Sequence, residues 1–398
     1  MTPHPQVIIV GAGILGLASA YHILQNQSGL GLLVVERFPG PGLGDTAKSA
    51  AAFRDMFSSP VNRALSQGSI AAYDRIQADS SGIGLKKIGY LWLMTARQAE
   101  ERRGVLAAMA QAGVQFETLD LPELSKRLPE LRLLDLSQGI LGNNCGILDP
   151  LKLARFYEEG MLRLGGQVHY RREVTGFSRD ARGQINGIEM GEEVIPGGTV
   201  IIATGAWTGR VLARAGLIAP VIPIKRQLFS VPARKEALAR LLNTATFSSH
   251  HLLPFTILPE GAYLRPERAS FILGFANEDQ PPGLEEPARA QRGFFEARIR
   301  PQVERYFPDF QGLAPSHAWA GHYDEHPPDS TPFVARLGGA LVVGGSSGSG
   351  VMKADSLGRI AAAALVGQEA VELGLGGHFR VSDLGLKDRA VPPEEFVI

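Results

Sequence analysis

The chain has 398 residues, which at about 150 residues per domain is enough for two or three domains. Its 40 Lys and Arg residues balance 40 Asp and Glu residues, so it lacks the basic excess that nucleic acid or an anionic membrane surface requires of a partner. Cys145 is the only cysteine, which excludes intramolecular disulfides and cysteine-ligated iron–sulfur clusters and favours a reducing, cytoplasmic compartment.

The N-terminal residues predict a strand, a glycine turn, a helix and a second strand. Val7–Val10 and Leu32–Val35 are apolar runs rich in β-branched residues, which is typical of buried strands. Between them lie the turn GAGILG at Gly11–Gly16 and a stretch compatible with a helix over 17–25. Residues 5–35 carry no charge, but glycines and polar residues interrupt them, so we predict neither a signal peptide nor a membrane span there.

The glycine turn has the spacing of a dinucleotide-binding loop. Gly11 suits the tight turn, Gly13 allows backbone to approach a pyrophosphate, and Gly16 allows close helix–strand packing. The pyrophosphate would sit at the helix N-terminus, whose N–H groups and dipole favour an anion. Glu36 follows Gly16 by twenty residues and would accept hydrogen bonds from a ribose diol. The alternative is a glycine-rich turn followed by a surface glutamate.

The rest of the chain alternates between strand and helix patterns. We predict helices over 61–79, 96–112, 150–164 and 287–306, and a last helix that follows Gly350 and runs through Leu357 and Ile360 to Val366. We predict strands over 89–93, 168–174, 185–190, 199–203, 227–231, 262–265, 270–275 and 340–343. The last dozen residues, 387–398, are expected to form a surface tail.

Glycine is over-represented, with 47 residues where an average content of about 7% would give about 28. Two further glycine segments follow apolar strands: TVIIATGAW at Thr199–Trp207 and LVVGGSSGSG at Leu341–Gly350. The second would direct a helix N-terminus at an electron-poor or anionic group. A flavin edge gains negative charge on reduction, so this arrangement favours FAD over a nicotinamide dinucleotide. Either segment alone could also be a loop without a ligand.

The ordered motifs make the chain resemble the FAD-dependent amino-acid and amine oxidoreductases. That family includes D-amino-acid oxidase, glycine oxidase, sarcosine oxidase, dimethylglycine dehydrogenase and dye-linked L-proline dehydrogenase. The resemblance is carried by residues 7–24, Glu36-Arg37, GDTAKSAAAFR (44–54), IGYLWL (88–93), LDPLKLA (148–154), ATGAW (203–207), PIKRQLF (223–229), WAGHYDEHPPDSTP (319–332) and GGSSGSGVMKADSLGRIAA (344–362).

The resemblance implies an α/β fold with a Rossmann-like FAD-binding domain built from discontinuous segments and a sheet-based α+β substrate domain. We expect the first to comprise 1–85, 149–220 and 332–386, and the second 86–148 and 221–331, with 387–398 as the tail. FAD would be bound noncovalently, because Gly321 stands where part of the family carries a flavin-tethering cysteine. The residues expected to bind it are Gly11, Gly13, Ile14, Gly16, Glu36, Arg37, Lys48, Ser49, Val174, Thr204, Gly205, Trp207, Gly348, Ser349, Gly350, Val351, Met352 and Lys353.

The resemblance also implies a reaction, in which the α-hydride of an amine passes to flavin N5. Tyr323 stands where glycine-oxidase-like members carry a carboxylate-binding arginine, which favours a secondary or N-methylated amino acid such as proline or sarcosine. Ile272 aligns with a lysine thought to activate oxygen, which favours a dehydrogenase over an oxidase. Two alternatives remain open: a flavin-dependent 2-hydroxy-acid dehydrogenase, and a flavin-bearing assembly or electron-transfer subunit of a larger complex.

Four residues are candidates for substrate contacts. Arg54 would bind a carboxylate bidentately, with a surface arginine as the alternative. Tyr263 shares a strand face with Arg265, which is either a substrate wall or an exposed face. Tyr323 and His322 complete the set.

We expect no metal site, no nucleic-acid partner and an unreactive Cys145. His317, His322 and His326 are irregularly spaced and Pro327-Pro328 prevents a regular helix, so we interpret them as loop histidines rather than metal ligands. The expected partners are a small amino-acid substrate and an unidentified electron acceptor, with a homo-oligomer or a partner subunit as further options. The expected location is the cytoplasm or the periphery of a membrane electron-transport chain.

Overall fold

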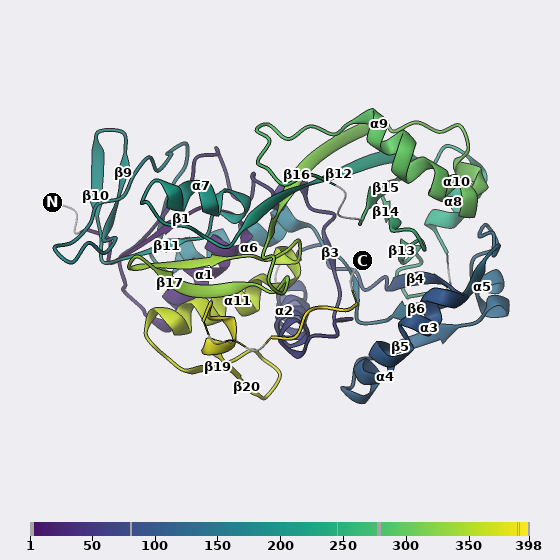
Figure 1. The fold of residues 1–398 in the computed structure, drawn as a ribbon, viewed down its shortest axis with the longest axis horizontal. Helices are drawn as coiled ribbons and strands as arrows, with labels where there is room; N and C mark the ends of the chain where they lie inside the picture. Colours follow the sequence, from purple (N-terminus) through teal and green to yellow (C-terminus); the bar gives the residue numbers. More distant parts are fainter. Residues whose placement is uncertain are drawn as a thin grey trace.

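A six-stranded sheet organises the half of the protein that contains the N-terminus (Figure 1). The computed structural model describes residues 4–79, 82–244, 246–276, 280–387, 389 and 391–396. The strand order is β17-β18-β11-β1-β2-β8, and all neighbours are parallel except the antiparallel pair β17–β18. The strands are β1 (Val7–Val10), β2 (Leu32–Val35), β8 (Gln167–His169), β11 (Thr199–Ile202), β17 (Phe333–Leu337) and β18 (Ala340–Gly344).

Four of these six strands match their predicted bounds to within a residue, β17 was not predicted, and the strand predicted over 168–174 is shorter than expected. It ends at His169, and Arg171 then adopts a positive φ of 58°, which takes the backbone out of the extended conformation. The fully buried pattern of β1 and β2 follows from their position inside a parallel sheet that is covered on both faces.

Helices cover one face of this sheet, and a hairpin with a short helix covers the other. The first layer contains α1 (Ile14–Asn26), α2 (Pro60–Asp79), α6 (Pro150–Arg163) and α11 (Gly350–Leu365), and the second contains β9 (Gly187–Met190), β10 (Glu193–Pro196) and α7 (Thr208–Ala213). Among the helices of the described residues, none has the length and apolar character that crossing a bilayer requires.

A buried carboxylate joins three of the covering helices. Asp355 of α11 accepts hydrogen bonds from His22 of α1 (2.9 Å), Tyr157 of α6 (2.9 Å) and Arg359 (2.7 Å). Burial raises the pKa of Asp355, but the hydrogen bond and charge of His22 together with Arg359 outweigh this and lower it to about 2. These bonds fix the packing of α1 and α6 against α11.

A second, eight-stranded sheet forms the other half, with the order β16-β12-β15-β14-β13-β4-β6-β5. Its neighbours are antiparallel except for the parallel pair β13–β4. The strands are β4 (Tyr90–Thr95), β5 (Phe116–Leu119), β6 (Leu136–Gly142), β12 (Ile222–Pro232), β13 (Phe255–Ile257), β14 (Ala262–Glu267), β15 (Ser270–Phe275) and β16 (His317–Glu325).

Alternation along these strands gives the sheet two different faces. Leu91, Leu264 and Leu273 point to the outer core, where helices cover the sheet, whereas Tyr90 and Tyr263 point toward the first half. The helices of this half are α3 (Ala96–Glu101), α4 (Arg103–Gln111), α5 (Leu121–Arg127), α8 (Glu236–Leu242), α9 (Arg292–Phe294) and α10 (Arg300–Tyr306).

Two predicted helices differ from the structure. The helix predicted over 96–112 is divided into α3 and α4 at Arg102. The helix predicted over 287–306 begins only at Arg292, and a π-helical turn over Phe295–Ile299 separates α9 from α10. This wider turn immediately precedes Pro301, which lacks the N–H that a regular helix requires.

The described residues of the segment predicted as a surface tail, 387–398, differ in exposure: Lys387, Pro392, Pro393 and Glu395 are exposed, whereas Phe396 is buried. In Figure 1 the yellow C-terminal segment crosses from the half that contains the N-terminus and ends near β3 (Ala52–Phe53). Strand β3 pairs with β7 (Gly146–Ile147). Phe396 is fully buried, with its ring centre 4.9 Å from that of Trp92. The segment also carries buried polar contacts, described below, which a solvated tail would not make. The remaining short strands are β19 (Ala370–Glu372) and β20 (His378–Arg380).

Candidate active site

A cavity of about 330 Å³ lies between the two sheets and is lined by residues from both. One side is formed by the carboxyl ends of β1, β2 and β11 together with the loop over 44–54. The other side is formed by β12, β14 and β16, and the loop that precedes α11 closes it. Ligands of open parallel sheets bind beyond the carboxyl ends of the strands, so this is the expected position for a dinucleotide.

The β1–α1 turn has the backbone geometry that its glycines predict. Gly11 has φ +106°, and a Cβ there would lie 2.5 Å from the carbonyl oxygen of Ala203. A Cβ on Gly16 would overlap the carbonyl of Gly11, so Gly16 permits the close packing of α1 on β1. Gly13 is the N-cap of α1 and lines the cavity, and Thr46 accepts a hydrogen bond of 3.1 Å from the Ile14 N–H.

Glu36 is held at the end of β2 by two backbone donors. Its Oε2 accepts a hydrogen bond of 2.7 Å from the Ala12 N–H, and its Oε1 accepts one of 2.8 Å from the Phe38 N–H. Next to it the Arg37 guanidinium lies 4.5 Å from the centre of the Trp207 ring. The carboxylate therefore connects the glycine turn to the second strand, facing the cavity.

The second glycine loop is held against β16 by a buried carboxylate. Asp324 accepts hydrogen bonds from the N–H (3.0 Å) and the hydroxyl (2.5 Å) of Ser346. Gly348 has φ +78°, and a Cβ there would overlap the ring of Tyr323. The glycines of this loop thus let the chain pass beside Tyr323 before α11 begins at Gly350.

The predicted cofactor residues gather at this one cavity, with a single exception. Those that line it are Gly11, Gly13, Ile14, Glu36, Arg37, Lys48, Ser49, Val174, Thr204, Gly205, Trp207, Gly348, Ser349, Gly350, Val351, Met352 and Lys353. The exception is Gly16, which contacts the Gly11 backbone behind the cavity wall. These residues fit FAD: the glycine turn suits the diphosphate, Glu36 the ribose, and the loop before α11 the flavin.

The four predicted substrate residues also line the cavity: Arg54, Tyr263, His322 and Tyr323. Tyr263 packs over Gly274, where any Cβ would overlap its ring, so the face it occupies is a cavity wall and not an exposed surface. Arg265 lies on the same strand face but is buried away from the cavity, where its Nη1 contacts Glu267 at 2.8 Å.

Arg226 is a cavity residue that the sequence analysis did not select. Its guanidinium lies 4.6 Å from the centre of the Tyr323 ring, and its buried Nε has no hydrogen-bond partner among the described residues. The available signal was its place in the PIKRQLF motif together with the two-residue period of a strand. That period puts Arg226 on the same face as Leu228, which also lines the cavity.

Two buried cations lie deeper in the wall. The Nη1 of Arg54 donates to the carbonyl oxygens of Met56 and, at 2.9 Å, Phe396, and burial lowers the pKa of this arginine. The ammonium of Lys353 donates to the Oδ1 of Asn62 at 2.8 Å and lies 4.6 Å from the centre of the Phe57 ring. Burial lowers the pKa of Lys353 to about 7.

His322 is held as a neutral imidazole. Its Nε2 accepts a hydrogen bond of 3.1 Å from the backbone N–H of Glu285, and burial lowers its pKa. The backbone N–H of His322 donates to Asp45 at 3.1 Å. His326 instead pairs with Asp329, and within the described ranges no three His, Cys, Asp or Glu residues are placed to hold a metal ion.

Gly321, Cys145 and Ile272 bear on how the flavin is attached and on whether the enzyme is a dehydrogenase. Gly321 lines the cavity beside Asp45 and Lys48. Cys145 is fully buried outside the cavity, with its thiol 3.7 Å from Asp55. Ile272 lies on the inner face of β15 but does not line the cavity, because it pairs with Ser230 and Arg265 one step beyond the row of Leu228, Gly274 and Tyr263.

A Rossmann-like sheet with a glycine turn and an acidic residue at the end of its second strand, joined to a second sheet across the cavity, defines the architecture of a flavin-binding oxidoreductase. The family of FAD dependent oxidoreductases matches residues 6–364, and the chain belongs to this family. The expected fold, cofactor and enzyme class are thereby confirmed.

Individual proteins are similar over most of their length. The FAD-dependent oxidoreductase domain-containing protein 1 of Xenopus laevis is 27% identical, covering 90% of this chain and 79% of that protein. Among solved structures, L-proline dehydrogenase from P. horikoshii superimposes with a TM-score of 0.79 at 21% identity, covering 92% of this chain and 94% of that one. Glycine oxidase from Geobacillus kaustophilus superimposes with a TM-score of 0.80 at 19% identity, covering 98% of this chain and 100% of that one.

Proposed function

We propose that this enzyme is a dehydrogenase that oxidises a small secondary or N-methylated amino acid such as proline or sarcosine. The observation that carries the proposal is the guanidinium of Arg226, which is stacked on Tyr323 and has a buried Nε without a hydrogen-bond partner among the described residues. A guanidinium in this state suits the carboxylate of an amino acid, which it would bind with parallel N–H groups. The structural neighbour named for L-proline supports a secondary amine, and the one named for glycine supports an amino acid in general.

The residues around Arg226 suit a substrate with a small apolar body. Tyr263, Leu228 and Phe255 form the sheet side of the cavity, which excludes water from the carbon that loses hydride. FAD, when bound, would accept that hydride, which carries both electrons, from the carbon next to the amine nitrogen. The phenol of Tyr323 and the guanidinium of Arg226 fix the carboxylate, so the same carbon is presented at each turnover.

Two finer points of the proposal rest on the cavity wall. Leu228 makes this part of the cavity wall apolar, and Ile272, at the position that aligns with the oxygen-activating lysine, lies on the same sheet face one step beyond that wall. Within the described residues the lysines that line the cavity are Lys48 and Lys353. This supports a dehydrogenase rather than an oxidase. Gly321 lines the cavity and Cys145 does not, which supports noncovalent FAD. Acid precipitation should therefore release the flavin into the supernatant.

The test is an anaerobic reduction screen with D- and L-amino acids, N-methylglycines and 2-hydroxy acids. Flavin bleaching by proline or sarcosine and slow reoxidation on admitting air support the proposal. Bleaching by 2-hydroxy acids alone would indicate a hydroxy-acid dehydrogenase, and rapid reoxidation with peroxide release would indicate an oxidase. Tight FAD without bleaching, together with partner chains in the purified material, would indicate an electron-transfer subunit. Fractionation of the cells that produce the protein would show whether it is found in the cytoplasm or at a membrane.

A further inference from the structure

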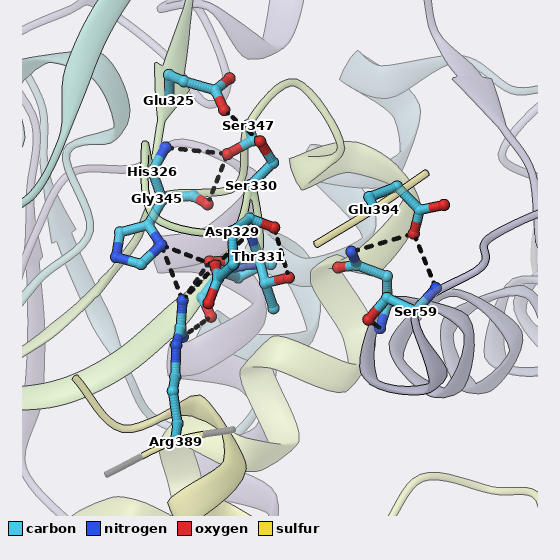
Figure 2. Close-up of polar contacts among 12 residues, drawn as sticks. Ser59, Glu325, His326, Asp329, Ser330, Thr331, Gly345, Ser347, Arg389 and Glu394 are labelled. Atoms are coloured by element: carbon cyan, nitrogen blue, oxygen red, sulfur yellow. Dashed lines mark hydrogen bonds and ion pairs between the residues drawn. The ribbon is translucent and has the colours of Figure 1, made fainter. Parts of the chain in front are cut away.

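The described C-terminal residues are attached to the body of the protein at two points, both drawn in Figure 2. The first is Arg389, whose Nη2 contacts the Oδ1 of Asp329 at 2.6 Å and the Nδ1 of His326 at 2.8 Å. The same guanidinium donates to the carbonyl oxygens of Thr331 and Pro332. Its side chain is 6% exposed, so this contact is buried as well as charged.

The second point of attachment is Glu394, at the N-terminus of α2. Its Oε1 accepts hydrogen bonds from the N–H (2.7 Å) and hydroxyl (2.8 Å) of Ser58. Its Oε2 accepts them from the Ser59 N–H (3.1 Å) and from the amide of Asn62 (3.5 Å). An anion at a helix N-terminus is favoured by the exposed N–H groups and by the helix dipole. Glu394 also lines the active-site cavity.

These contacts lead directly to the two buried cations. The amide of Asn62 that donates to Glu394 accepts a hydrogen bond from Lys353 through its Oδ1. Two residues further along the segment, the carbonyl oxygen of Phe396 accepts a hydrogen bond from Arg54. The C-terminal segment therefore provides one fixed acceptor for Arg54 and fixes the acceptor used by Lys353.

We propose that Glu394 is a positioning residue of the substrate pocket. It holds Lys353, which lines the same cavity as Arg226, through Asn62, and so sets how much positive charge Lys353 adds to the binding of a small carboxylate by Arg226. The inference rests on the proposed amino-acid substrate and adds a residue from the far end of the chain to its binding site. Without Glu394, Asn62 loses the partner that orients its amide, and Lys353 loses the carboxylate that most favours its charged form.

The charges that face Lys353 give the direction of the pH effect. Burial lowers the pKa of Lys353, and Arg54 lowers it further, whereas Glu394, Glu325 and Asp324 raise it. Glu394 is the largest of the three raising contributions. Its removal therefore lowers the pKa of Lys353, and the ammonium is lost at a more acidic pH.

The test is a titration of the purified FAD-loaded protein with acetate at a series of pH values between 5.5 and 9. The change in flavin absorption reports acetate binding. The variants are Glu394→Gln and Glu394→Asp, with Glu395→Gln as the control, because Glu395 is exposed on the same segment. We expect Glu394→Gln to weaken acetate binding by about tenfold at neutral pH and to move the pH midpoint to lower pH. Glu394→Asp keeps the negative charge, so its pH midpoint should stay close to that of the unchanged protein. Glu395→Gln should match the unchanged protein in both affinity and midpoint.

Each other outcome overturns the proposal for a different reason. Equal acetate affinity in Glu394→Gln and the unchanged protein would show that Glu394 does not act on the pocket. If both Glu394 variants lost acetate affinity equally at every pH and their pH midpoint did not move, the role of Glu394 would be purely structural. No acetate binding by the unchanged protein would instead reject the amino-acid substrate on which the inference rests. Flavin content, measured on every sample, separates these results from loss of folding.

Discussion

The guanidinium of Arg226 reaches diagonally across two neighbouring strands to lie 4.6 Å from the centre of the Tyr323 ring. In the register of β12 and β16, Arg226 pairs with Gly321, and Tyr323 is two residues further along. A Cβ on Gly321 would lie 3.0 Å from the Oδ1 of Asp45 and 3.0 Å from the Cβ of Lys48. The glycine therefore lets the loop over 44–54 pack closely against the strand that carries Tyr323.

The first prediction concerns Arg226. Changing Arg226→Met should raise KM for the amino-acid substrate about 100-fold, because a charge-assisted contact of about 3 kcal/mol is lost. Arg226→Lys keeps the charge but loses the planar fork, so its KM should rise only about tenfold. Steady-state kinetics with a dye acceptor measure both. Arg292→Met, at a side chain that is 83% exposed, is the control. An unchanged KM in Arg226→Met would assign the carboxylate to another cation.

The second prediction concerns the contact between Gly348 and Tyr323. Gly348→Ala combines a positive φ with overlap on the Tyr323 ring, so we expect a loss of about 2–4 kcal/mol in unfolding free energy and weaker substrate binding. Gly191→Ala is the matched control, since Gly191 also has a positive φ but nothing lies within 4 Å of the added Cβ. It should lose only about 1 kcal/mol, with KM unchanged. Equal losses in the two variants would mean that the overlap is relieved without moving Tyr323.

The third prediction concerns Glu36 and cofactor retention. Glu36→Gln should purify with less flavin and raise the dissociation constant for FAD about tenfold to 100-fold, because an amide presents a donor where two backbone N–H groups need acceptors. Quenching of FAD fluorescence on titration with the FAD-free protein measures the constant. The exposed Glu192→Gln should leave it unchanged. Full flavin occupancy in Glu36→Gln would show that Glu36 does not bind the ribose.

The nucleotide-binding half could be predicted because its signals are local. Val7–Val10, the turn at Gly11 and the acid at Glu36 lie within thirty residues, and the strand and turn conformations follow from their own side chains. Arg226 and Glu394 were missed because their roles depend on distant partners. Arg226 matters through the register of β12 with β16, and Glu394 through its contact with Ser58. No local pattern encodes a pairing between residues that lie so far apart in the chain.

The last prediction concerns pH and Lys353 in the FAD-free protein. Its native pKa of about 7 lies below the ordinary value of 10.5, so between these values the unfolded chain binds more protons than the folded one. The cost of burying the ammonium is therefore fully present below pH 7 and is relieved as the pH rises. From pH 7 to 9 this group should add about 2 kcal/mol to the unfolding free energy, a rise that Lys353→Met should abolish. Urea unfolding at the two pH values measures it. Lys126→Met, at an exposed lysine, should retain the rise, and a rise that persists in Lys353→Met would place its origin in another group.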